Sequence, residues 1–278
     1  MMSPIASENK DPKAASSITI MDDLKCALLL NNAGIGALME GQRRRAFELF
    51  RNAFDIISSC AAGEEDCKVD PLGYQEVVYP ASVYQAKVPF IPVSVPGIKF
   101  TTEAAGNSDD DVSCQRSATA CGGTYYRNQP QQAAAYTFGK VFLFHPMLEL
   151  ERDCVDSFRA VMLYNMALLY HNASVNPHDE YEATALALYE TCLELLERDD
   201  CPDDLACVYI GALNNTIQIH HGRADLATTQ TLLDDLGTIL RETLKRKDGH
   251  QHFLDDQDIH GLLLNVTCQR ALICAAGA

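Results

Sequence analysis

The chain has 278 residues, of which 47% are hydrophobic, so it is long enough for one large domain with a continuous apolar core. That composition excludes a disordered or fibrous protein. Its formal net charge is −16, from 22 Lys and Arg against 38 Asp and Glu, and a surface of that sign repels phosphate groups. We therefore expect no nucleic-acid partner.

The cysteines and the amino-terminal residues indicate the compartment. Eleven cysteines are present, an odd number, and no C-x-x-C pair occurs. This usage is typical of reduced, buried thiols, although the equal spacings Cys60 to Cys67 and Cys114 to Cys121 leave a disulfide or metal site as an alternative. The first twenty residues lack the apolar core of a secretory signal, and no stretch approaches the ~20 apolar residues of a membrane helix. We expect an intracellular protein, in the cytoplasm, with no membrane partner.

The first half of the chain divides into three parts. Residues 1–20 are polar and are expected to be a disordered tail. Residues 21–60 carry apolar residues at helical spacing in two runs that Gly41 separates, which predicts a helical hairpin. Seven of the eleven prolines fall between residues 71 and 146, where they prevent long helices. Residues 61–146 are therefore expected to be an insertion, mostly loop with short extended segments such as 136–144.

The second half returns to helical periodicity. Residues 147–278 predict two further helical hairpins and a C-terminal capping helix, which form one domain with residues 21–60. Proline followed by acidic residues, at 177–180 and again at 202–204, is a typical helix start. This half contains 22 acidic and nine basic residues, a net charge of −13. The acidity of the chain therefore lies mostly here.

One short motif recurs in the predicted helices. An asparagine within an apolar run stands at positions 32, 165, 215 and 265, and the last three are 50 residues apart. A fixed period of this size, built from helix pairs, is typical of stacked helical repeats. Because an unpaired buried amide is costly, we expect each of these asparagines to bind backbone at a hairpin junction.

The best-formed unit is residues 27–60, where small and large residues alternate at the spacing of a known repeat. They are Leu30, Gly34, Gly41, Ala46, Phe50 and Ala53. Through this unit, and more loosely through residues 163–192 and 213–227, the chain resembles the tetratricopeptide-repeat (TPR) family. The resemblance implies an all-α fold, a right-handed stack of antiparallel helical hairpins with a long insertion after the first hairpin. A non-repetitive bundle of six or seven helices is the alternative.

A catalytic or metal site is the weaker functional hypothesis. The residues that recur are packing residues, and the others show no acid, base and nucleophile within common reach, so we do not expect an enzyme or a bound cofactor. The alternative is an enzyme or metal-binding helical protein that uses His250, His252 and His260, since imidazole is an ordinary metal ligand. We interpret these histidines instead as part of a polar loop and the start of the last helix.

The TPR resemblance implies a concave groove lined by the first helix of each hairpin. The positions expected to face it are Leu28, Asn31, Ile35, Leu38, Tyr164, Leu168, His171, Asn214, Gln218 and His221. Family members that bind acidic chaperone tails do so with Lys or Arg at such positions, and none is present here. We therefore expect a protein-protein interaction scaffold or adaptor, not of the acidic chaperone-tail clamp type. Its groove would take a neutral or basic, partly apolar segment, from another protein or from the chain's own insertion.

Overall fold

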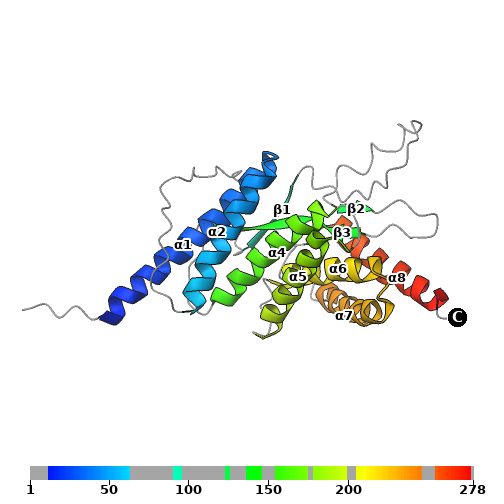
Figure 1. Cartoon of the computed structure of the whole chain (residues 1–278). Helices are drawn as coiled ribbons and strands as arrows, with labels where there is room; N and C mark the ends of the chain where they lie inside the picture. The colour runs from blue at the N-terminus through cyan, green and yellow to red at the C-terminus, as the bar shows by residue number, and fades with distance from the viewer. Residues whose placement is uncertain are drawn as a thin grey trace, which may run out of the picture.

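The structure is a computed structural model that describes residues 12–62, 90–95, 123–125, 136–145, 154–174, 178–198, 205–245 and 254–276. Most of these residues are helical, as the sequence predicted. The helices of this part of the chain are α1 (Pro12–Met39), α2 (Arg43–Ala62), α4 (Val155–Ala173), α5 (Glu180–Arg198), α6 (Ala206–Gly222), α7 (Leu226–Lys245) and α8 (Asp256–Ala276) (Figure 1).

Each helix packs against the next described helix along the chain, from α1 to α8 (Figure 1). The turn between α1 and α2 contains Gly41 at a φ of +77°, a backbone conformation that glycine adopts without strain. The two helices approach closely where Gly34 faces Phe50, because a Cβ atom on Gly34 would lie 2.8 Å from the Phe50 ring. The glycines noted in the sequence thus shape the first hairpin.

The expected amino-terminal tail is too long. Helix α1 begins at Pro12 rather than at Met21, so residues 12–20 of the expected tail are helical and only residues 1–11 lie outside the described residues. Proline is favoured in the first turn of a helix, where its missing N–H has no intrahelical partner to bond, and the alanines that follow it are strong helix formers. The tail was predicted from the polar composition of this stretch, which does not prevent a helix from forming.

Helix α2 ends at Ala62, two residues later than expected, and beyond it the described parts of the insertion are mostly extended. They are the strands β1 (Phe90–Ser94), β2 (Gly123–Tyr125), β3 (Tyr136–Phe138) and β4 (Lys140–Phe144). Strand β4 pairs with β1 and β3 pairs with β2, both antiparallel. Only Gly139 separates β3 from β4, so residues 136–144 form one extended stretch, called the central segment below. Most of the remaining residues of the expected insertion lie outside the described residues.

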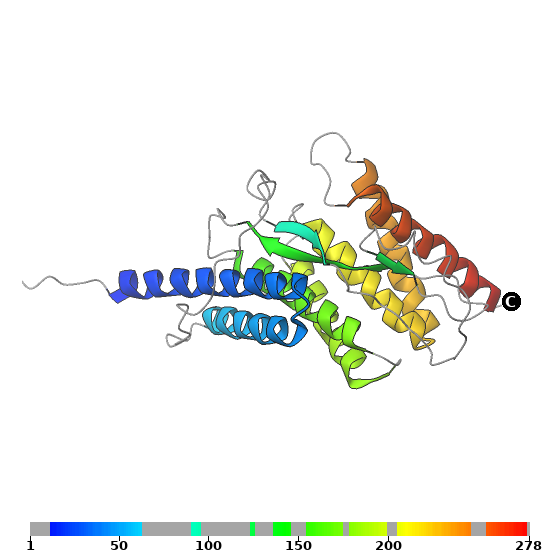
Figure 2. The same cartoon turned by 90° about the horizontal axis from the view of Figure 1, so that it is seen from above.

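The central segment runs across the helices, as Figure 2 shows from above. Strand β4 contacts α1 and α4, and strand β3 contacts α6 and α8. Every residue from 136 to 144 is buried. The segment therefore belongs to the hydrophobic core, together with the faces of the helices that it crosses. None of the described helices combines the length and apolar character that a membrane crossing requires.

Candidate functional site: an asparagine-lined groove

Four asparagines, one from each helix that the central segment crosses, bind its backbone in the same way. In each case the side-chain amide donates from Nδ2 to a backbone carbonyl, and Oδ1 accepts the N–H of the same residue. The eight donor-acceptor distances lie between 2.6 and 3.0 Å. The pairs are Asn32 with Phe144, Asn165 with Phe142, Asn215 with Phe138 and Asn265 with Tyr136. We call these four residues the clamp asparagines.

The spacing of the clamped residues follows from strand geometry. In an extended chain, alternate residues direct their N–H and C=O groups to the same edge. Residues 136, 138, 142 and 144 therefore face the asparagines, and the opposite edge is available to β1 and β2. Pro92 of β1 stands opposite Phe142, whose N–H is bonded to Asn165, so the missing proline N–H leaves no ladder bond unmade. The segment is held along both edges.

Two further asparagines complete the polar lining. Asn31 donates to the carbonyl of Phe142 at 3.2 Å and accepts a bond from Asn165 at 3.0 Å. Asn214 likewise donates to the carbonyl of Tyr136 at 3.0 Å and accepts a bond from Asn265 at 2.7 Å.

The helix pair α1 and α4 thus repeats the arrangement of α6 and α8. All six asparagines are buried, with exposed fractions of 5% or less. Since buried amides require partners, the groove needs an extended backbone within it.

An ion pair lies at the middle of the segment, between the clamped residues 136 and 138 on one side and 142 and 144 on the other. The Lys140 ammonium lies 2.8 Å from an Asp255 carboxylate oxygen and also bonds Asp258. The hydroxyl of Tyr136 donates to the other Asp258 oxygen. Lys140 and Asp258 are 8% and 3% exposed, so these charges neutralise one another away from solvent. Asp258 and Asp255 lie at the start of α8, where a helix favours negative charge.

The electrostatics of this cluster follow from its partners. Burial by itself would lower the pKa of Lys140, but the hydrogen bonds and charges of Asp255 and Asp258 raise it above its ordinary value. Burial by itself would raise the pKa of Asp255, but the bonds that it accepts from Lys140 and from the Asp258 backbone bring it below the ordinary value. At neutral pH the lysine is therefore a cation and the Asp255 carboxyl an anion.

Two glycines make room for the aromatic side chains of the segment. A Cβ atom on Gly211 would lie 2.6 Å from the ring of Phe138, and one on Gly261 would lie 2.3 Å from the ring of Tyr136. Each glycine precedes a clamp asparagine by four residues, which is one helical turn. The rings of Phe138 and Tyr136 therefore rest directly on the backbones of α6 and α8.

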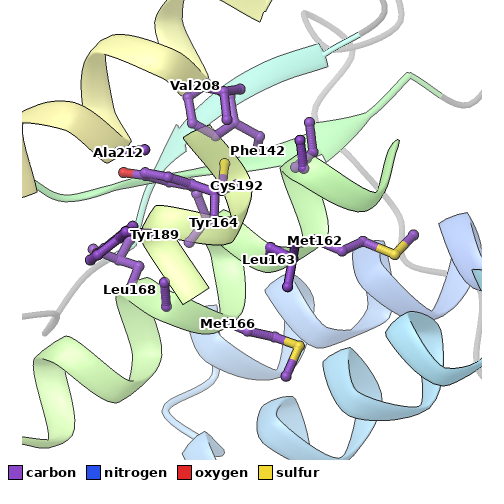
Figure 3. Close-up of a cluster of buried hydrophobic side chains, with 14 of the residues drawn as sticks. Phe142, Met162, Leu163, Tyr164, Met166, Leu168, Tyr189, Cys192, Val208 and Ala212 are labelled. Carbon is purple, nitrogen blue, oxygen red and sulfur yellow. The ribbon is translucent and has the colours of Figure 1, made fainter. Parts of the chain in front are cut away.

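Tyr164 joins the segment to the core below it (Figure 3). Its ring lies 5.2 Å from that of Phe142 and 5.8 Å from that of Tyr189, and its hydroxyl donates to the Phe138 carbonyl at 3.1 Å. Complete burial raises the pKa of the Tyr164 hydroxyl well above its usual value. The hydroxyl therefore stays protonated at neutral pH and donates to Phe138, the residue that Asn215 of α6 also binds.

Nine of the ten positions expected to line an open groove are instead buried. Asn31, Tyr164 and Asn214 bind the backbone of the central segment. Gln218 accepts a bond from Gln269 of α8 at 3.0 Å. His221 is half-buried, and the other positions are buried in the core: Leu28, Ile35, Leu38, Leu168 and His171. Residues 136–144 of the chain's own insertion, one of the two sources considered from the sequence, therefore lie against these helices.

The sequence identified the recurring asparagines but misplaced their partners. They do bind backbone, yet the backbone belongs to the insertion and not to a hairpin junction. The signal was their recurrence in the predicted helices, where three of them directly follow Asn31, Tyr164 and Asn214, positions that were expected to face the groove. Gly211, Gly261 and the ion pair of Lys140 were not anticipated as parts of the groove.

The histidine alternative gains no support from the described residues, which contain no group of His, Cys, Asp or Glu suited to hold a metal ion. His260 is exposed on α8, and Asp258 beside it is engaged by Lys140. His250 and His252 lie outside the described residues.

Comparisons with protein-family models, curated proteins and solved structures found no match to this chain.

Proposed function

We propose that this chain is a protein-protein interaction scaffold, a right-handed TPR-like stack whose asparagine-lined groove recognises an extended segment through its backbone. The observation that carries the proposal is the set of four clamp asparagines, each of which makes two hydrogen bonds to the backbone of one residue in the central segment. The packing of consecutive helices, with α1, α4, α6 and α8 all against that strand, supports the repeat architecture.

Recognition of this kind suits a peptide ligand. Backbone hydrogen bonds give affinity for any extended chain, while pockets for alternate side chains add specificity, as in other modes of strand recognition. Each net bond contributes about 1 kcal/mol, so a row of such bonds favours binding without dictating sequence. The lining residues are amides, buried aromatic side chains and two carboxylates that are paired with Lys140, an arrangement suited to holding a segment, and we therefore propose a binding protein rather than an enzyme.

The resident central segment indicates the kind of partner. It contains one lysine and no acidic residue, and its other side chains are mostly apolar. The second half of the chain carries a net charge of −13, which attracts basic segments and repels acidic ones. A partner segment of neutral or basic, apolar character would exchange with residues 136–144 in the groove.

The exchange can be tested with a full-length variant in which residues 136–144 are replaced by glycine and serine, called the vacated variant. A labelled peptide of residues 134–146 should bind this variant, measured by fluorescence anisotropy. Methylation of the peptide amides of Phe138 and Phe142 removes the donors to Asn215 and Asn165 and should abolish binding.

Methylation of the Gly139 amide, which by the strand period faces the other edge, is the matched control and should weaken binding less. Equal binding of the two methylated peptides, or no binding of the parent peptide, would contradict the proposal.

A further inference from the structure

We propose that the start of α8 is a lysine-binding subsite of this groove, formed by Asp255 and Asp258. On this assignment, partner segments carry lysine at the position of Lys140 and aromatic side chains two and four residues before it. The inference rests on the proposed function, because it names the sequence that the same groove selects.

The clamp asparagines cannot select a sequence or fix a register. Their hydrogen bonds to the segment go to backbone N–H and C=O groups, which all residues except proline present alike. A slide of the segment by two residues would return the same edge of the backbone to the same asparagines. Sequence selection must therefore come from side-chain contacts.

Position 140 supplies such a contact. It lies on the same edge of the strand as the clamped residues, but its bonds within the described part of the chain run from its ammonium to two carboxylates of α8. Asp258 is 3% exposed, and a buried carboxylate without a cation is strongly unfavourable. A slide by two residues would place Phe138 or Phe142 against these carboxylates. Lysine is thus required at one position in one register.

Two aromatic positions, 136 and 138, are selected by the shape of the groove and, at Tyr136, by one hydrogen bond. The absence of a side chain at Gly261 and Gly211 leaves space that the rings of Tyr136 and Phe138 fill. The Tyr136 hydroxyl also donates to Asp258, so this carboxylate contacts two side chains of the segment, four residues apart. The groove therefore favours the pattern Tyr-x-aromatic-x-Lys.

The decisive test compares two peptides of identical composition on the vacated variant. One is the 134–146 sequence, and in the other Lys140 and Val141 are exchanged, so that net charge is kept while the lysine leaves the subsite. We expect the exchanged peptide to bind at least about 30-fold more weakly, the loss typical of a truncated buried charge pair. Asp258→Asn in the protein should remove this preference.

Asp256→Asn is the matched control, because Asp256 is an exposed carboxylate in the first turn of the same helix, and the preference should persist. Equal binding of both peptides would overturn the lysine subsite and leave the scaffold proposal standing. Failure of every peptide to bind would overturn both.

A second measurement uses the intact chain and does not depend on the vacated variant folding. Lys140→Met and Asp258→Asn should each lower the denaturation midpoint. The midpoint of the double variant should fall by much less than the sum of the two single decreases, because the two residues act as one pair. Fully additive decreases in the midpoint would show that Asp258 and Lys140 do not interact energetically and would overturn the subsite.

Discussion

Replacement of Asn165 by leucine should destabilise the protein through the central segment. The Phe142 N–H would lose its acceptor, and Asn31 Oδ1 would lose its donor, while the Phe142 carbonyl would retain the bond from Asn31. Each buried group left without a partner costs about 1 to 3 kcal/mol. After a partial gain from burying leucine, we expect the free energy of unfolding to fall by about 1 to 5 kcal/mol.

The assay is chemical denaturation followed by circular dichroism, with Asn52→Leu as the control. Asn52 is a half-buried residue of α2, on a helix that does not contribute a clamp asparagine, and its replacement should change stability by no more than about 0.5 kcal/mol. Asn215→Leu should behave like Asn165→Leu, because Asn215 clamps Phe138 in the same manner. If both clamp variants kept the denaturation midpoint of the parent, the hydrogen bonds to the segment would not stabilise the fold.

Three further results are expected. Gly261→Ala places a Cβ atom within 2.3 Å of the Tyr136 ring and should cost about 1 to 3 kcal/mol in denaturation, whereas Gly222→Ala, with open space around it, should be neutral or stabilising; equal effects would refute this packing. Burial lowers the pKa of His171 to about 4. The unfolded chain therefore binds a proton below pH ~6.5 that the folded chain does not, and His171→Leu should remove about 2 kcal/mol of the stability lost between pH 7 and pH 5; an unchanged pH profile would contradict this. An acidic chaperone-tail peptide should not bind at ~100 μM in calorimetry, and binding tighter than that would refute the assigned groove chemistry.

The helices could be predicted because their signals are local. Apolar spacing, Gly41 at the first turn, and proline followed by acidic residues lie within a few positions of the boundaries that they set. The start of α1 at Pro12 was missed because residues 12–20 lack an apolar face that periodicity would detect. The available signals were Pro12, which suits the first turn of a helix, and the helix propensity of the alanines that follow it.

The site was harder to predict because its contacts join distant parts of the chain. Asn32 binds Phe144 and Asn265 binds Tyr136, and no spacing rule connects residues more than a hundred positions apart. The recurrence of the asparagines showed that they share a role, but not which backbone they bind. The partner of Asp258 was also hidden, because acidic residues at a helix start have a sufficient local explanation.

The central claim is that residues 136–144 lie in the asparagine-lined groove, and amide hydrogen exchange measured by NMR tests it most directly. The amides of Tyr136, Phe138, Phe142 and Phe144 should be protected as strongly as those in the middle of α4 and α6, because each is bonded within the core. In the Asn165→Leu variant the Phe142 amide should lose protection first. Exchange of these four amides at the rate of an unstructured chain would contradict the account.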